Sequence, residues 1–238
     1  MIKNEEAKTS VKMRIIVLAI AIFMLGSTFA LYAGLVLNYN NPATTSTSQK
    51  QKRFEELYAQ YQEKLNAQAA ELSNKYFSEF SQYRNRVKSF NAASVGVLTV
   101  TDLKVGTGRE LTDISDIDYA AYYIGWLSNE TIFDSSFDNT SEPTALVAPL
   151  EGSQSMIQGW LEGIARSTNE DGTVEWEGMR IGGIREISIP ATLGYGATEK
   201  GDIPANSPLK FVVMLIEKPE EVEVPAELEQ LYVELYGE

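Results

Sequence analysis

The longest hydrophobic stretch of this chain lies near its N-terminus. Residues 15–37 form a run of 23 residues without a charge, and about 20 apolar residues are enough to cross the core of a bilayer as a helix. We therefore predict a transmembrane helix over 15–37. A cleavable signal peptide is the alternative, but its apolar region is normally only about 7 to 15 residues long.

Basic residues are unevenly placed around this predicted span. Residues 38–49, which follow it, contain no Lys or Arg. Because loops on the cytoplasmic side are enriched in Lys and Arg, residues 1–14 are expected to be a cytoplasmic tail and the rest of the chain to lie outside the cytoplasm. The predicted location is thus a cell membrane, crossed once. The basic residues before the span are Lys3, Lys8, Lys12 and Arg14, and three more follow at Lys50, Lys52 and Arg53 and weaken the asymmetry.

The pattern then changes to a polar segment followed by a helical repeat. Residues 38–49 are mostly Ser, Thr and Asn, and they predict a linker that buries little surface. Residues 50–92 predict a helical stalk, because apolar side chains recur there at steps of three and four without Gly or Pro. These apolar positions are Phe54, Tyr58, Tyr61, Leu65, Ala69, Leu72, Tyr76, Phe80, Tyr83, Val87 and Phe90.

Three uses of such a stalk are consistent with its apolar stripe. The stripe could pair with a second copy as a coiled coil and make a homodimer, pack on the chain's own downstream segments, or bind extended client polypeptides. Aromatic residues occupy much of the stripe, whereas a stable two-stranded coiled coil prefers Leu, Ile or Val at its seam. An amphipathic helix most commonly packs on its own chain.

After residue 94 the helical period gives way to short apolar runs separated by Gly, Asp, Asn and Pro, which predicts a β-rich domain over 95–218. One short helix is predicted over 156–165, so the fold class is α+β. Residues 219–238 form an acidic C-terminal tail with a short helix over 225–236. Strands are predicted over 96–105, 117–126, 132–134, 144–150, 181–190 and 208–217.

Composition excludes several kinds of chemistry. The chain has neither Cys nor His, which excludes a Ser-His-Asp triad, a thiol nucleophile, a Cys/His zinc site and disulfides. We predict no metal and no cofactor. Residues 1–92 carry a net charge of +5 out of the total of -13, which leaves -18 for residues 93–238. An acidic domain of this kind is a poor binder of nucleic acid, because phosphate contacts need clustered Lys and Arg.

Three groups of residues within 95–218 carry a recognisable pattern. The first group is Tyr123-Ile124-Gly125-Trp126-Leu127 followed by Phe133-Asp134-Ser135-Ser136, and the second is Met156-Ile157-Gln158-Gly159-Trp160-Leu161-Glu162-Gly163. The third runs from Gly178-Met179-Arg180-Ile181-Gly182-Gly183 through Leu193-Gly194-Tyr195-Gly196 to Ile203-Pro204-Ala205-Asn206 and Leu209-Lys210-Phe211. Taken in this order and spacing, the three groups resemble the FKBP-type peptidyl-prolyl cis-trans isomerases over about half the chain.

The resemblance implies an FKBP-like half-open antiparallel sheet wrapped around one short helix, with an apolar pocket that accepts a prolyl side chain. Trp160 is then the pocket floor, and Tyr195 matches the tyrosine whose hydroxyl donates to a bound carbonyl. The catalytic residues implied are Tyr123, Phe133, Asp134 and Tyr195, and the substrate-binding residues are Met156, Ile157, Trp160, Ile203 and Phe211. The partners implied are proline-containing polypeptides and the macrolide inhibitors of the family.

This sequence departs from the family pattern at three places. Thr144 stands where many members carry an aromatic pocket wall, and Phe137-Asp138-Asn139 stand where an Arg often pairs with the aspartate of the FDSS run. The segment 167–177 is longer than expected, and its Asp171-Gly172 pair predicts an inserted hairpin.

The function predicted from these features is isomerisation of X-Pro bonds, which assists the folding of secreted or envelope proteins. Rotation about an amide bond needs neither a nucleophile nor a proton shuttle, so the lack of His and Cys is compatible with it. The alternative is a non-catalytic module that holds clients or a partner on the membrane-anchored stalk. A purely structural spacer is a third reading, but it leaves the pocket motif unexplained.

Overall fold

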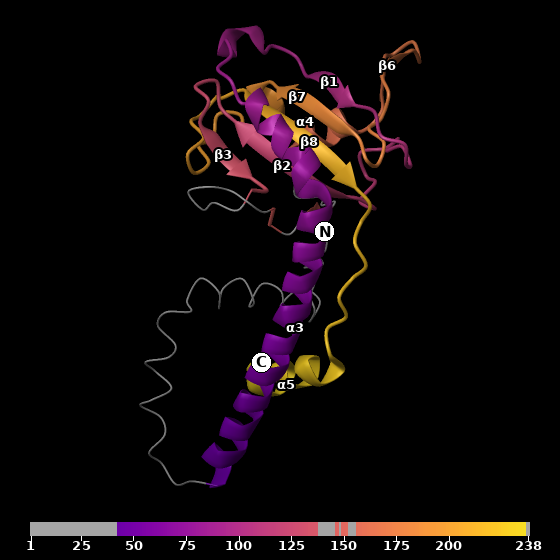
Figure 1. Ribbon diagram of the computed structural model, residues 1–238. Coiled ribbons are helices and arrows are strands. Elements are labelled where there is room, and N and C mark those ends of the chain that lie inside the picture. Colours follow the sequence, from indigo (N-terminus) through magenta and orange to yellow (C-terminus); the bar gives the residue numbers. More distant parts are fainter. Residues whose placement is uncertain (1–41, 138–145, 148, 152–155, 237–238) are drawn as a thin grey trace, which may run out of the picture. The chain divides into compact units, whose positions relative to one another are not determined.

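The computed structural model describes residues 42–137, 146–147, 149–151 and 156–236 (Figure 1). The described chain divides into two compact units, one made of residues 42–66 and 221–236 and the other of residues 67–220. The predicted tail over 1–14 and the predicted membrane span over 15–37 lie outside the described residues. Within the described ranges, no helix is both long enough and apolar enough to cross a membrane.

The first unit is built from two helices. The N-terminal part of α3, which runs over Pro42–Phe80, packs against α5 over Ala226–Tyr236. Phe54 and Tyr61 of α3 are buried against Leu228 and Tyr232 of α5. The Arg53 guanidinium donates to both carboxylate oxygens of Glu227 at 2.8 and 2.7 Å. The C-terminal helix predicted over 225–236 is therefore present and covers the stripe of α3.

The bounds of α3 differ from the prediction at both ends. The helix begins at Pro42, so a linker over 38–49 was wrong for residues 42–49. Pro suits the first turn of a helix, because the backbone N–H groups of that turn have no hydrogen-bond partner within the helix and Pro has no N–H to leave unpaired. At the other end, η1 over Ser81–Arg86 follows Phe80. The chain then turns extended because Phe90 N–H donates to Ser128 O and the Lys88 carbonyl accepts from the Trp126 indole.

The second unit contains an antiparallel sheet with the strand order β1-β7-β8-β2-β3, in which the short strand β4 also pairs with β2. Figure 1 shows β7, β8 and β2 side by side, with α4 near them. The strands cover Thr99–Lys104 (β1), Ala120–Trp126 (β2), Ile132–Ser135 (β3), Leu150–Glu151 (β4), Ile184–Ile189 (β7) and Leu209–Ile216 (β8), and the helices cover Gln158–Ile164 (α4), Ala92–Ser94 (η2) and Ala191–Leu193 (η3).

Both faces of the two central strands are buried, which explains their continuous apolar runs. Phe211, Val213 and Leu215 of β8 point to the face that α4 covers, together with Trp160 and Ile164 of the helix. The alternate residues of β2 and β8 point to the opposite face, where Phe80 at the end of α3 is completely buried. This second cluster includes Ala120, Tyr122, Ile124, Trp126, Val212, Met214 and Ile216.

The described part of α3 therefore uses its apolar stripe on its own chain. Phe54 and Tyr61 are buried in the first unit, and Phe80 is buried in the second. Of the three uses considered for the stalk, the structure shows packing on the chain's own segments. In this arrangement the buried positions are not accessible to a second helix or to a client.

The strand predicted over 144–150 is shorter in the structure. Only Leu150–Glu151 forms a strand among the described residues, and 138–145 and 148 lie outside them. Leu146 makes an isolated bridge with Phe137, and its N–H donates to the Ser73 hydroxyl of α3 at 2.8 Å. That bond to the helix replaces continued pairing with the sheet, and periodicity along the segment alone could not reveal it.

Candidate functional site

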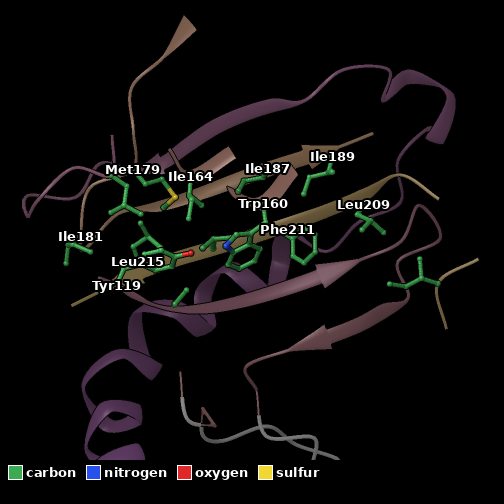
Figure 2. Packing of buried hydrophobic residues seen from close by; sticks show 14 of the residues in the cluster. Tyr119, Trp160, Ile164, Met179, Ile181, Ile187, Ile189, Leu209, Phe211 and Leu215 are labelled. Atoms are coloured by element: carbon green, nitrogen blue, oxygen red, sulfur yellow. The ribbon is translucent and has the colours of Figure 1, made fainter. Parts of the chain in front are cut away.

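The site is centred on Trp160, which the first turn of α4 holds against the sheet. The backbone N–H of Trp160 donates to the Ile157 carbonyl at 3.0 Å, and the indole ring is completely buried. Its ring meets those of Tyr123 and Phe211 edge to face, with centroids 5.5 and 5.3 Å apart. Figure 2 shows Trp160 and Phe211 together above the sheet. Aromatic pairs prefer this edge-to-face geometry, so the two contacts hold the indole ring in a fixed position.

Two glycines allow α4 to approach β7 closely. A Cβ on Gly163 would lie 2.6 Å from Ile187 Cγ2, and a Cβ on Gly159 would collide with Ile189 Cγ2. Both isoleucines belong to β7 and are buried. Since Gly159 and Gly163 are four residues apart, they lie on the same face of the helix. The glycines of the second sequence group therefore set the depth at which Trp160 lies.

Phe133 and Phe211 form a second aromatic contact beside Trp160, with centroids 5.5 Å apart. Phe133 lies on β3 and is half-buried, whereas Phe211 lies on β8 and is buried. Gly125 of β2 leaves room for both, because a Cβ there would lie 2.6 Å from Phe211 Cε1 and 2.7 Å from Phe133 Cζ. Three rings from α4, β3 and β8 thus form one apolar surface.

A single hydrogen bond joins the polar groups at the edge of this surface. The Tyr123 hydroxyl donates to Asp134 Oδ2 at 2.7 Å. Burial, and next the hydrogen bond to Asp134, raise the pKa of the Tyr123 phenol. The phenol therefore stays protonated at neutral pH and acts only as a donor to that carboxylate. Of the positions where an Arg was expected to pair with this aspartate, 138 and 139 lie outside the described residues.

Tyr195 lies in the loop after η3, close to the same carboxylate. Burial, followed by the negative charge of Asp134, raises the pKa of the Tyr195 phenol. The loop is closed by the N–H of Gly196, which donates to Ala191 O at 2.9 Å. Gly196 has φ of 59°, a conformation that glycine adopts without strain. The glycine after Tyr195 thus supports the turn that presents its hydroxyl.

The remaining predicted substrate-binding residues join the same cluster. Ile203 is buried in it, and Met156 and Ile157 are partly buried against it. Eight of the nine predicted residues therefore contact one apolar cluster, and Asp134 is joined to it through Tyr123. Thr144, named as a departure from the family pattern, lies outside the described residues.

Two residues that the sequence analysis did not select also belong to the site. Ser136 is buried and bonds twice to Tyr123: its hydroxyl accepts from Tyr123 N–H at 2.9 Å, and its N–H donates to Tyr123 O at 2.9 Å. Leu193 packs against the Trp160 cluster. Both lie within runs that were noted, FDSS and LGYG, but the role of a serine in fixing a neighbouring strand has no signal in sequence alone.

The inserted hairpin is present beside α4. It consists of β5 over Ser167–Thr168 and β6 over Val174–Trp176, which pair antiparallel. Gly172 has φ of 82° in the connecting turn, as the Asp-Gly pair predicted. The Trp176 indole N–H donates to the Ala165 carbonyl at 3.1 Å, which ties the hairpin to the end of α4.

Comparison with known proteins places the same region in one family. A family model described as "FKBP-type peptidyl-prolyl cis-trans isomerase" matches residues 117–216. An "FK506-binding protein" of Neisseria meningitidis serogroup A is 36% identical over 123 residues, which cover 51% of this chain and 96% of that protein. A protein of Buchnera aphidicola named "FKBP-type peptidyl-prolyl cis-trans isomerase FkpA" is 30% identical over 142 residues, which cover 60% of this chain and 47% of that protein. Among solved structures, that of AtFKBP13 shares 32% identity and covers 51% of this chain and 93% of that chain, with a TM-score of 0.39.

Proposed function

This chain belongs to the family of FKBP-type peptidyl-prolyl cis-trans isomerases and is an enzyme of that type, and from that premise we propose that the surface around Trp160 is its prolyl site. The observation that carries the proposal is the contact of Trp160 with both Tyr123 and Phe211. These three rings come from a helix and two strands that are far apart in sequence. Only the fold brings them together, beside a donor and a carboxylate.

The apolar character of this surface suits the chemistry of the X-Pro bond. Rotation about the bond has a barrier of about 18 to 20 kcal/mol because amide resonance must be broken. The twisted amide separates less charge than the planar amide. Transfer from water to an apolar surface therefore costs the twisted amide less free energy than it costs the planar amide. A site accelerates a reaction through this difference between the transition state and the ground state. Trp160, Phe133 and Phe211 are the groups that would exclude water from the prolyl ring.

The two phenols orient the substrate in this proposal. The Tyr195 hydroxyl donates a hydrogen bond to the carbonyl oxygen of the residue before proline. Tyr123 is held by Asp134 at 2.7 Å and fixes the position of the carboxylate. The carboxylate of Asp134 then faces the twisting amide, where its negative charge stabilises the carbonyl carbon as resonance is lost. No proton is transferred in these steps.

The chain offers its own internal controls for a binding experiment, because it contains three tryptophans. Trp126 is buried on the opposite face of the sheet, and Trp176 lies on the inserted hairpin. We expect a short X-Pro peptide to shift the indole N–H resonance of Trp160 in NMR spectra and to leave Trp126 and Trp176 in place. A peptide that shifts Trp126 but not Trp160 would place the site elsewhere.

The macrolide inhibitors of the family are proposed to bind at the same surface as the prolyl substrate. Several relatives carry the name "FK506-binding protein". A ligand that occupies the Trp160 surface must compete with an X-Pro peptide for it. We expect FK506 to move the Trp160 resonance and to raise the apparent KM of the peptide without changing kcat. An inhibitor that lowers kcat with KM unchanged would contradict a shared site.

The proposed cellular setting is a membrane-anchored enzyme that acts on secreted or envelope proteins outside the cytoplasm. The proposal is supported by the uncharged run over 15–37 and by the four basic residues that precede it. After cell fractionation we expect the full chain in the membrane pellet, released by detergent but not by high salt. Protease added to cells whose outer envelope layer has been permeabilised, with the cell membrane intact, should digest the isomerase domain. A full chain found in the soluble fraction would contradict the anchor.

A further inference from the structure

A concavity lies where α4 ends. It has a volume of about 300 Å³ and is formed between the segment before β1, the loop around Ile114, α4 and the inserted hairpin. None of the residues that form the proposed prolyl site lines it. It is therefore a separate groove, which we call the hairpin groove and define by Val97, Ile114, Glu162, Glu175 and Trp176.

The hairpin groove exposes apolar side chains on a rigid base. Val97 is 69% exposed and Ile114 is 52% exposed. Leu98 lines the groove and packs against the Trp160 cluster, so the base of the groove is continuous with the core. Trp176 is held by its hydrogen bond to the Ala165 carbonyl. An apolar group that entered this groove would cover exposed Val and Ile without needing the base to rearrange.

The charges that line the hairpin groove leave an excess of negative charge. The Arg166 guanidinium is paired with two carboxylates, those of Glu110 and Glu177, each at 2.7 Å. The two acidic groups of the groove are bonded to neutral donors instead. Glu162 accepts from the Gln158 amide at 2.6 Å, and Glu175 accepts from the Ser167 hydroxyl at 3.0 Å. A positively charged group is therefore the complementary partner for this rim.

The helix α4 connects the hairpin groove with the proposed prolyl site. Trp160 lies in its first turn, and the groove residue Arg166 lies two residues beyond its last residue. Gln158 and Glu162 lie one turn apart on the helix, on a line that leads from the first turn to the groove. At 1.5 Å per residue, α4 rises about 9 Å from Gln158 to Ile164, and Arg166 lies two non-helical residues further along the chain. An extended polypeptide covers that rise in about three residues, and at least one more is needed to reach the groove.

We propose that the hairpin groove is a second client-binding site, which takes an extended apolar segment containing Lys or Arg that lies about four or more residues from the isomerised proline. This inference rests on the proposed prolyl site. Binding of both segments of one polypeptide raises its effective concentration at the prolyl site, so such clients are isomerised at lower concentrations than short peptides are. Selection is thereby extended beyond the residues that flank the proline.

NMR spectra separate the two sites, because each contains its own tryptophan. The short probe is a four-residue X-Pro peptide. Two long probes add a Leu-Lys-Leu-Lys segment four residues from the proline, one on its N-terminal side and one on its C-terminal side. We expect at least one long probe to shift the indole resonances of both Trp160 and Trp176, and the short probe to shift Trp160 alone. If neither long probe shifts Trp176, the groove proposal is overturned; if no probe shifts Trp160, the prolyl-site proposal fails instead.

Two valines of equal exposure provide matched variants for the kinetic experiment. Val97 lines the groove and Val105 lies beyond the other end of β1, and each is 69% exposed. We expect Val97→Asp to raise the KM of the responding long probe about tenfold, the effect of losing about 1.4 kcal/mol. The short probe should be processed at the normal rate by both variants, and Val105→Asp should process the long probe normally. An equal change for both probes, or no change with Val97→Asp, would overturn the proposal.

A charge reversal tests the acidic rim without altering the apolar base. Glu175→Lys should weaken the binding of the Leu-Lys-Leu-Lys probe and strengthen the binding of a probe in which Glu replaces each Lys. Should Val97→Asp lower the unfolding midpoint, Ile114→Asp gives the same kinetic comparison at a different position of the groove. If Glu175→Lys affects the basic and acidic probes alike, the charge complementarity proposed here is wrong.

Discussion

Gly125 shows how one missing side chain shapes the prolyl site. Its hydrogen leaves space in which the rings of Phe133 and Phe211 meet, and a methyl group there would lie within 2.7 Å of both rings. Phe211 is part of the buried cluster, so it has little room to move away. In the sequence this position is seen only as a glycine that lies between Tyr123 and Trp126.

We predict that Gly125→Ala weakens substrate binding more than it weakens the fold. The added methyl group displaces Phe133, the less buried of the two rings, from the apolar surface. Because the half-buried Phe133 ring can move aside, the added methyl group should cost less folding stability than overpacking of a core, which costs about 1 to 3 kcal/mol. The displaced ring no longer covers the substrate, so KM for an X-Pro peptide should rise about tenfold, which corresponds to about 1.4 kcal/mol. Gly96→Ala is the control, because nothing lies within 4 Å of a Cβ there. Equal kinetics for the two variants would show that the Phe133 ring is not part of the site.

The titration of the two tyrosines gives a second residue-scale prediction. Burial and Asp134 raise the pKa of both phenols, Tyr123 and Tyr195. A phenol with a raised pKa stays protonated until the pH exceeds its ordinary value of about 10. We therefore expect kcat/KM to stay constant within about twofold from pH 6 to pH 9. Loss of activity with a midpoint below pH 9 would mean that a different donor orients the substrate.

At the scale of single elements, β7 and β8 are joined by a charged group that is mostly buried. The Glu186 side chain is only 12% exposed and accepts from Lys210 at 2.9 Å and from Arg86 at 2.8 and 2.6 Å. Burial opposes ionisation, but the bonds to Lys210 and Arg86 outweigh it and hold the pKa of Glu186 below its usual value. This group therefore links η1 to the sheet in a pH-dependent way.

The sign of that link follows from the lowered pKa. A carboxyl group with a lower pKa in the folded state stabilises the fold above its unfolded pKa, about 4.3 for Glu, and the contribution is lost as the pH falls through the folded value. We predict that Glu186→Gln lowers the free energy of unfolding by about 2 kcal/mol at pH 7. The difference from the unmodified chain should shrink as the pH falls from 5 to 3. Glu199→Gln, at an exposed loop position, should show no such difference in urea unfolding.

The last part of α3 is expected to be part of the isomerase fold rather than a spacer before it. Phe80 is completely buried against Tyr122 and the other residues of the second cluster. A fragment that begins at residue 93 would expose this face, whereas residues 67–220 form a compact unit. Because loss of a single buried Phe costs about 3 to 5 kcal/mol, the 93–220 fragment should be less stable than 67–220 by at least about 3 kcal/mol. Equal urea midpoints would contradict this role of α3.

At the scale of the whole molecule, the sequence was most informative where one local pattern decides the outcome. The helical period predicted α3, short apolar runs bounded by turn residues predicted the strands around Tyr123 and Phe211, and the Asp-Gly pair predicted the hairpin at 167–177. The family pattern brought together residues that no periodicity relates, including Trp160 and Asp134. These predictions depend on neighbours in sequence or on a known arrangement.

The remaining features depend on contacts between distant residues. The extended segment after η1 is held by hydrogen bonds that join Lys88 to Trp126 and Phe90 to Ser128, and Leu146 is held by a bond to Ser73. The partner of the α3 stripe could not be chosen from the stripe itself, because an amphipathic helix fits its own chain, a second copy or a client equally well by pattern. Glu162 and Glu175 come together only because the hairpin folds onto α4.

The central claim, that the surface around Trp160 isomerises X-Pro bonds, is tested most directly by catalysed exchange. The measurement is the cis-to-trans rate of a four-residue X-Pro peptide with residues 42–238, and with the same chain carrying Tyr195→Phe or Asp134→Asn. Uncatalysed exchange takes tens to hundreds of seconds, so acceleration is readily seen. We expect the unaltered chain to accelerate exchange and each variant to lose about tenfold in kcat/KM with unchanged unfolding. Full activity in both variants would contradict the proposed site.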